Sequence, residues 1–319
     1  MRKQKRMIVT CVLLIVAILS ACNSQDQPKE AEAKEKANPS ETEYRTYTDY
    51  LGHKVEIPNS PKQVIYQGEN YGDLLPLNAD IIGGSYSWIT GLIFEDQVKN
   101  VEDVGFPINL EKVLELKPDL IIIADTDEKV FEQLSKIAPT VVFDTFAPLD
   151  NRLMELGDIV NKKQEATEWL KEYKQKEEAM WKQLLDQGIL ESGETASVFT
   201  YYPGDRLFVM ASTGLSQVLY HPSGFKPGDK IQPILDQGKG FEQISLELLP
   251  EFAGDRIFIL TPETDEAIQS TKDMLNSPVW KGLPAVKNGK VYSLDILKTS
   301  SDASTREWLI EEIPSLLNK

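Results

Sequence analysis

Two stretches of the chain, 136 positions apart, share one pattern without a gap. Residues 109–123 read NLEKVLELKPDLIII, and residues 245–259 read SLELLPEFAGDRIFI. Each starts with a residue that can cap a helix and continues as a short apolar helix with Glu in its first turn. A Pro or Gly then leads to Asp and a buried strand. A chain that builds this unit twice is predicted to form two similar lobes, each with a carboxylate at a matching position, Glu111 and Glu247.

Short apolar segments alternate with helical ones along both halves of the chain, which is the pattern of an α/β protein. The predicted strands are 64–66, 81–84, 120–124 and 141–144 in the first half, and 197–201, 207–210, 257–260 and 290–294 in the second. A last helix is predicted over 303–317. We therefore expect two similar lobes with central sheets flanked by helices.

The segment between the two halves has neither Gly nor Pro from Lys163 to about Gln187, and its apolar residues recur mostly every three or four positions. This spacing predicts an amphipathic helix of roughly 25 residues, about 37 Å long, that joins the lobes rigidly. A coiled-coil dimer seam is the competing interpretation, although it would have only about three heptads. The expected domains are an N-terminal lobe (46–160), the connecting helix (161–188) and a C-terminal lobe (189–319).

The beginning of the chain has the features of a secretion signal. Four basic residues precede an apolar run from Met7 to Ala21, which is too short for a stable membrane-spanning helix. The Leu19-Ser-Ala-Cys22 segment resembles a bacterial lipoprotein processing site, so residues 1–21 are the expected signal peptide and Cys22 the expected lipidated N-terminus. An ordinary signal peptide with a chance cysteine is the alternative. Cys11 would be removed with the signal, so no disulfide is expected within the mature chain.

The residues that follow are polar. Residues 22–45 contain almost no large apolar side chain, so we expect a flexible tether. Removal of the four basic signal residues would change the formal charge from −16 to −20. A body this acidic argues against binding to nucleic acid or lying flat on anionic lipid.

Several segments, in their order and spacing, carry a resemblance to a known family. They are Asp49–Pro58, Val104-Gly105 followed by 109–122, Leu156–Ile159 before the connecting helix, and Lys287–Tyr292. Together they resemble the single-helix-linked, class III substrate-binding lipoproteins that deliver iron siderophores, haem or cobalamin to ABC importers, here of Gram-positive type. The resemblance covers essentially the whole mature chain. It implies a monomer whose partners are a small ligand, an ABC permease with its ATPase, and a membrane reached through the lipid anchor.

The resemblance also gives the repeated glutamates a role. In such proteins one Glu on each lobe forms a salt bridge with arginines of the permease, and the matching positions here are Glu111 and Glu247. Without the resemblance, a glutamate in the first turn of a helix could merely complement the helix dipole.

Ligand contacts in this architecture come from loops that follow the strands of each lobe. The first lobe offers aromatic residues and carboxylates there, but no Lys or Arg before Lys129. Many relatives have an aromatic residue and an arginine in the stretch matching Ala211–Gly214, and this chain has neither. We expect a ferric siderophore of low net charge, of hydroxamate or citrate-hydroxamate type. The expected contacts are Tyr71, Tyr86, Trp88, Tyr201, Tyr202, Arg206 and Arg306.

Other functions remain open at this point. Packing within a lobe would also explain the aromatic residues, and the two arginines could simply be solvated. We expect no intrinsic cofactor or protein-bound metal, since His, Cys and paired carboxylates do not cluster at ligand spacing. Haem, with His221 or Met210 as axial ligand, and cobalamin are alternatives. A secreted enzyme is the third, but Ser216 lies in Gly-Leu-Ser-Gln-Val, which lacks the second glycine of a nucleophile elbow. A module that only senses ligand or adheres would not need the pair of docking glutamates.

Overall fold

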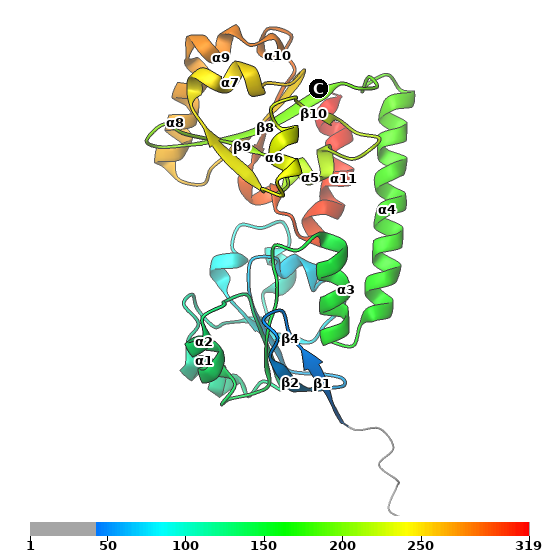
Figure 1. Cartoon of the computed structure of the whole chain (residues 1–319), viewed down its shortest axis with the longest axis vertical. Coiled ribbons are helices and arrows are strands. Elements are labelled where there is room, and N and C mark those ends of the chain that lie inside the picture. The colour runs from blue at the N-terminus through cyan, green and yellow to red at the C-terminus, as the bar shows by residue number, and fades with distance from the viewer. Residues whose placement is uncertain (1–42, 319) are drawn as a thin grey trace, which may run out of the picture. The chain divides into compact units, whose positions relative to one another are not determined.

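A computed structural model describes residues 43–318, and these residues belong to one compact unit (Figure 1). The predicted signal peptide, Cys22 and most of the predicted tether lie outside the described residues. Within residues 43–318, no helix has the length and apolar character needed to cross a membrane.

The N-terminal lobe is built on a parallel sheet of five strands in the order β5-β4-β3-β6-β7. The central strands β3 (Val64–Gln67) and β6 (Leu120–Ile123) are buried along their whole length, as expected where helices or loops cover both faces of a parallel sheet. The other elements of the lobe are β4 (Ile81–Gly84), β5 (Glu102–Asp103), β7 (Thr140–Val142), α1 (Leu110–Leu116), α2 (Glu128–Leu134), α3 (Leu149–Ile159) and the hairpin of β1 (Tyr44–Thr48) and β2 (Lys54–Pro58).

The C-terminal lobe has a mixed sheet of six strands. Five follow the order β11-β9-β8-β12-β13, and β10 pairs with β8. The pairs β8–β12 and β12–β13 are parallel, whereas β8–β9 and β9–β11 are antiparallel. The elements are β8 (Thr195–Tyr202), β9 (Arg206–Met210), α5 (Leu215–Leu219), β10 (Lys226–Pro227), α6 (Gln232–Asp236), β11 (Phe241–Ile244), α7 (Leu249–Phe252), β12 (Arg256–Thr261), α8 (Asp265–Asn276), α9 (Pro278–Gly282), α10 (Pro284–Lys287), β13 (Val291–Asp295) and α11 (Ala303–Leu317).

The sequence repeat corresponds to a structural repeat. Strand β6 lies between β3 and β7, and β12 lies between β8 and β13, with all four pairings parallel. The repeated aspartate has the same contact in both lobes: Asp119 accepts a hydrogen bond from the Lys62 backbone N (2.7 Å), and Asp255 accepts one from the Thr195 backbone N (2.9 Å). Each aspartate thus binds the chain close to the start of the neighbouring strand, which confirms two lobes of similar plan.

The helices of the two repeats differ. Asn109 Oδ1 caps α1 by accepting from the backbone N of Glu111 (3.0 Å). Ser245 also occupies the N-cap position of its helix, but its side chain makes no capping bond. The second repeat begins as a 3₁₀ helix, η4 (Leu246–Leu248), before α7. Pro250 has no N–H, so it cannot donate the hydrogen bond to the Leu246 carbonyl that a continuous α-helix would require.

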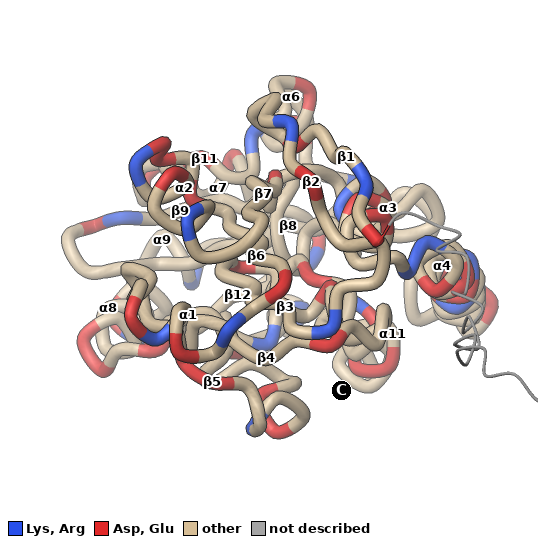
Figure 2. Tube along the Cα trace, turned by 90° about the horizontal axis from the view of Figure 1, so that it is seen from below, with Lys and Arg blue, Asp and Glu red and all other residues tan. Residues whose placement is uncertain are grey.

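The long helix α4 (Lys163–Asp186) agrees with the predicted connecting helix. Its apolar face is buried within the same chain, with Tyr173 and Trp181 among the buried residues, and it packs against α3 and α11. One continuous apolar core runs from the N-terminal lobe through α3, α4 and α11 to β8. In Figure 2, both acidic and basic residues are seen on the remaining surface of α4.

Candidate functional site

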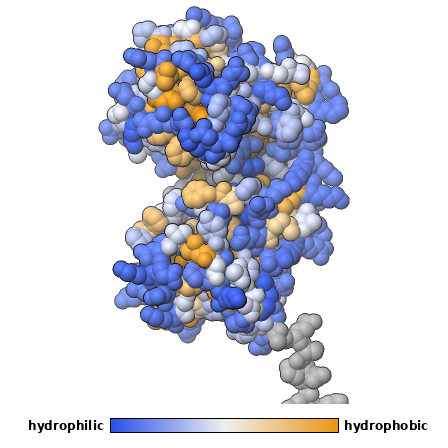
Figure 3. Space-filling model, in the orientation of Figure 1, coloured by the Kyte–Doolittle hydropathy of each residue, from blue (hydrophilic) through white to orange (hydrophobic). Residues whose placement is uncertain are grey.

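Three neighbouring cavities lie between or beside the lobes, and Glu69 lines all of them. The first cavity has a volume of about 570 Å³, the second about 690 Å³ and the third about 300 Å³. Residues of both lobes line the first and the second cavity. The Ile296–Ser301 segment contributes to the first two, and Trp88 to the last two. We call these three cavities, which share Glu69, the cleft. On the face in Figure 3, apolar and weakly polar residues flank the notch between the lobes.

Aromatic side chains form much of the N-terminal wall of the cleft. Tyr86 and Trp88, on the 3₁₀ helix η2 (Tyr86–Trp88) after β4, line the cleft as their positions in the sequence predicted. The Tyr86 hydroxyl donates to the Val101 carbonyl (2.9 Å), and the Trp88 ring packs edge-on against Phe106 with centroids 5.3 Å apart. Phe146, which is 89 % exposed, reaches into the first cavity. These positioned faces suit a ligand with apolar surface.

The C-terminal wall combines aromatic and small polar residues. Tyr202 lines the cleft, and the Arg206 guanidinium lies 5.5 Å from the centre of its ring. Phe241, 55 % exposed, lines the first cavity beside Met210, its partner in the β9–β11 ladder. Phe241 therefore places an aromatic face close to Ala211–Gly214, the stretch that itself has none. The sequence analysis missed Phe241 and Phe106, because Phe241 starts a short, largely exposed strand and Phe106 follows a glycine in a loop.

Four of the predicted ligand contacts are not among the residues that line the cleft: Tyr71, Tyr201, Arg206 and Arg306. Tyr71 is only 2 % exposed and belongs to the N-terminal core, because the chain turns inward after β3 into a 3₁₀ helix, η1 (Tyr71–Asp73). Tyr201 lies in the C-terminal core, with its hydroxyl donating to Asp205 (2.6 Å), because successive side chains of β8 face opposite sides of the sheet. Arg306 is 8 % exposed and lies behind the cleft, where it donates to Gln217, a residue that does line it.

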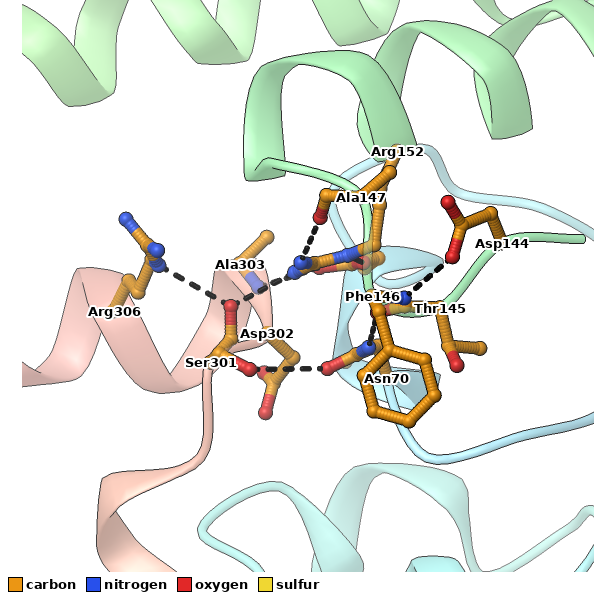
Figure 4. A network of polar contacts seen from close by, with 12 residues as sticks. Asn70, Asp144, Thr145, Phe146, Ala147, Arg152, Ser301, Asp302, Ala303 and Arg306 are labelled. Atoms are coloured by element: carbon orange, nitrogen blue, oxygen red, sulfur yellow. Dashed lines mark hydrogen bonds and ion pairs between the residues drawn. The ribbon is translucent and has the colours of Figure 1, made fainter. Parts of the chain in front are cut away.

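A buried polar network joins the start of α11 to the N-terminal lobe (Figure 4). Arg152 Nε donates to Asp73 Oδ2 (2.7 Å), and another guanidinium nitrogen donates to the Ser301 carbonyl (2.8 Å). Asp73 Oδ1 accepts from the Ala303 backbone N (2.7 Å), so the carboxylate contacts both Arg152 and α11. We call the contacts of Asp73 and Arg152 with residues 301–303 the lobe junction. It is a second connection between the lobes besides α4.

Burial dominates the electrostatics of the lobe junction. The side chains of Asp73 and Arg152 are 0 % and 2 % exposed. Burial raises the pKa of the Asp73 carboxyl, although the adjacent guanidinium opposes this shift. The pair therefore depends on its mutual attraction and on its hydrogen bonds to backbone groups.

Gly72 is required where α11 meets the N-terminal lobe. A Cβ atom at this position would lie 2.0 Å from Asp302 Oδ1 and 2.7 Å from Phe94 Cε1. Because Asp302 is fully buried and caps α11 by accepting from the Thr305 backbone N (2.9 Å), it has little freedom to move.

We expect Gly72→Ala to lower the free energy of unfolding by about 1–3 kcal/mol, the usual cost of overpacking. Thermal unfolding followed by circular dichroism would measure the change. Gly282→Ala is the matched control, because a Cβ there would meet nothing within 4 Å. Equal melting temperatures for the two variants would contradict the tight contact.

The two repeated glutamates lie on exposed surface, one on each lobe. Glu111 is in the first turn of α1, and Glu247 is in η4 just before α7. In both Figure 1 and Figure 2, α1 and α7 lie on the side of the molecule away from α4. Each glutamate has an exposed leucine near it in sequence, Leu114 (61 %) or Leu248 (41 %).

The residues named for haem binding and for catalysis lie in different places. Met210 lines the cleft. His221 instead stacks on Trp181 of α4, with ring centroids 6.5 Å apart. Ser216 is fully buried, and its hydroxyl donates to the Thr213 carbonyl (2.5 Å).

Comparison with known proteins gives consistent matches over most of the chain. A model of the periplasmic binding protein family matches residues 82–296. YxeB of Bacillus subtilis, an iron(3+)-hydroxamate-binding protein, is 33 % identical over 303 residues, which cover 92 % of this chain and 90 % of YxeB.

Solved structures agree with these matches. FhuD of S. pseudintermedius gives a TM-score of 0.74 at 26 % identity, and SirA of Staphylococcus aureus, complexed with staphyloferrin B, gives 0.74 at 29 %. Each alignment covers 86 % of this chain and 98 % of the other. On this evidence the chain belongs to the periplasmic binding protein family, whose members are binding proteins rather than enzymes.

Proposed function

We propose that this protein is the extracellular solute-binding component of an ABC importer and that it captures a ferric siderophore of hydroxamate or citrate-hydroxamate type. The main support is the cleft between the lobes, with aromatic faces on both walls. YxeB is named for iron(3+)-hydroxamate binding, and SirA was solved in complex with staphyloferrin B. In this proposal the siderophore supplies the ligands of the iron, and the protein binds the outside of the complex.

The residues proposed to contact the siderophore are three that line the cleft and Arg206, which stacks on one of them. Tyr86, Trp88 and Tyr202 would pack against its apolar surface, and Arg206, which is exposed and stacks on Tyr202, would donate hydrogen bonds to its oxygens. Arg306 would act indirectly, by orienting Gln217.

The proposed location is the outer face of the cell membrane. After removal of residues 1–21, a diacylglycerol group on Cys22 would supply two acyl chains, which is about what stable attachment requires. Residues 22–45 would act as the tether, and the protein would work as a monomer. Glu111 and Glu247 would bind arginines of the permease, to which an ATPase is coupled. Their exposure on corresponding elements of the two lobes supports this role.

Tryptophan fluorescence offers a direct test of ligand binding. The mature protein would be titrated with ferric hydroxamate, citrate and catecholate siderophores, with haem and with cobalamin. We expect saturable, sub-micromolar quenching by a ferric hydroxamate or citrate-hydroxamate complex. Trp88→Phe should reduce the quenching amplitude, because Trp88 lines the cleft whereas Trp181 and Trp280 are buried elsewhere.

Three other results of this titration would contradict siderophore binding. A Soret shift with haem and no response to siderophores would favour haem instead, with Met210 in the cleft as a candidate axial ligand. Binding of cobalamin alone would favour that cargo. If none of the compounds bound, the role of the cleft would be refuted.

A further inference from the structure

Glu69 lines all three cavities of the cleft, and one oxygen of its carboxylate lacks a hydrogen-bond partner among the described residues. It follows β3, the middle strand of the N-terminal sheet, and it is the residue that the three cavities share. Its Oε2 atom is inaccessible to solvent and has no hydrogen-bond partner. Within residues 43–318, no cationic side chain forms an ion pair with it. A carboxylate oxygen shielded from water and left unpaired is costly unless something else pairs with it.

Two further polar groups at the same place also lack partners. Trp88 Nε1, next to Glu69 in two of the cavities, is buried and has no acceptor. The Tyr66 hydroxyl is fully buried and unpaired, and it lies 3.0 Å from the position that a Cβ on Gly68 would occupy, at the wall of the third cavity. Burial raises the pKa of Tyr66 well above its usual range, and the charge of Glu69 adds to this shift, so the phenol stays neutral. The site thus combines an unused carboxylate with unused N–H and O–H groups.

The charges around the cleft favour a cation. Besides Glu69, the carboxylates Asp125 and Glu263 line it. Among the described lining residues the one cationic side chain is Arg152, and Asp73 already neutralises it. Arg206 stacks on Tyr202 and, like Lys298, is exposed and is not among the residues that line the cleft. A positively charged group beside Glu69 would thus lie in a cleft whose other charged and aromatic lining also attracts cations, with Asp125 in one cavity and Glu263 in another.

We propose that Glu69 binds an ammonium group carried by the ligand, so that the cleft selects cationic ferric hydroxamates over neutral ones of the same size. The ammonium would pair with the Glu69 carboxylate, whose residue lines all three cavities. This inference rests on the proposed function. It narrows the expected net charge of the ligand from low to positive.

A matched pair of ligands tests the proposal. Ferrioxamine B is a linear ferric trihydroxamate with a terminal ammonium, and N-acetylation of its amine removes that charge without changing the iron centre. We expect the unaltered protein to bind ferrioxamine B roughly 10- to 100-fold more tightly than the acetylated complex, as for a hydrogen bond between charged groups. Isothermal titration calorimetry on the mature protein would measure both affinities.

Glu69→Gln keeps the size of the side chain and removes its charge. We expect this variant to lose most of the preference through weaker binding of ferrioxamine B, with little change for the acetylated form. Glu132→Gln is the control, because Glu132 is exposed on α2, does not line the cleft and gives the same change in net charge. Thermal unfolding of both variants would confirm that each is folded.

The outcomes separate this inference from the proposed function. If the unaltered protein binds both complexes equally, or if Glu69→Gln retains the preference, the role of Glu69 is refuted while siderophore binding stands. If neither complex binds, and the wider set of ferric siderophores also fails, the proposed function falls and this inference falls with it.

Discussion

Replacing Arg152 with Ala should destabilise the protein more than any other single substitution considered above. The variant would leave Asp73 as a buried, uncompensated charge and remove the hydrogen bonds to the Ala147 and Ser301 carbonyls. Breaking a buried pair in this way typically costs about 3–5 kcal/mol. For a domain of this size, we expect the melting temperature to fall by roughly 6–20 °C, as measured by differential scanning calorimetry at neutral pH.

Lowering the pH should partly rescue this variant. Burial already raises the pKa of Asp73 above its value in the unfolded chain, and the loss of the guanidinium would raise it further. Between the unfolded and the folded pKa, the folded state binds more protons, so its stability increases as the pH falls through that window. The stability difference between Arg152→Ala and the unaltered protein should therefore shrink from pH 7 towards pH 5.

Arg206→Ala is the matched control for Arg152→Ala. Arg206 is exposed, so its loss should change stability little. A combined Asp73→Ala, Arg152→Met variant should be less destabilised than Arg152→Ala, because it leaves no unpaired charge. If Arg152→Ala had the same melting temperature as Arg206→Ala, the lobe junction would not be a source of stability.

The elements that the sequence predicted well are those defined by contacts close in sequence. The connecting helix needs only its own apolar periodicity, and α11 matches the predicted bounds of 303–317. The repeat predicted the place of β6 and β12, because an apolar run after Asp is a local signal for a buried strand. Strands β5, β10 and β11 were missed, because they have two to four residues and are largely open to solvent.

The lobe junction was not predictable in the same way. Asp73 and Ala303 are 230 positions apart, and neither belongs to a motif. Nothing local distinguishes Arg152 from the charged residues that usually lie on the exposed face of a helix. The loop rule for ligand contacts failed at Tyr71, because the residues after β3 turn into the core, and at Arg306, because this residue already belongs to α11 and bonds to Gln217. Strand alternation could have separated Tyr201 from Tyr202, since one of two neighbouring residues in a strand must face the core.

Removing both Glu111 and Glu247 should abolish uptake without weakening ligand binding. Neither residue lines the cleft, so the affinity for the ferric complex should stay unchanged. If each glutamate forms a buried salt bridge with the permease, its truncation costs about 2–5 kcal/mol of docking free energy. Two such losses weaken docking by roughly a thousandfold or more. Uptake of radiolabelled iron by cells that lack the native protein and express the Glu111→Ala, Glu247→Ala variant would measure this.

The control must carry the same change in charge on the same surface. Glu115→Ala, Glu251→Ala meets this requirement, because both residues are exposed on α1 and α7, close to the proposed docking positions. Normal uptake by the control and loss in the docking variant would assign the effect to Glu111 and Glu247 themselves. Each single variant should retain part of the uptake, because the other lobe still docks. If the double variant imported iron normally, the repeated glutamates would merely complement the dipoles of their helices, and the permease would have to recognise another surface.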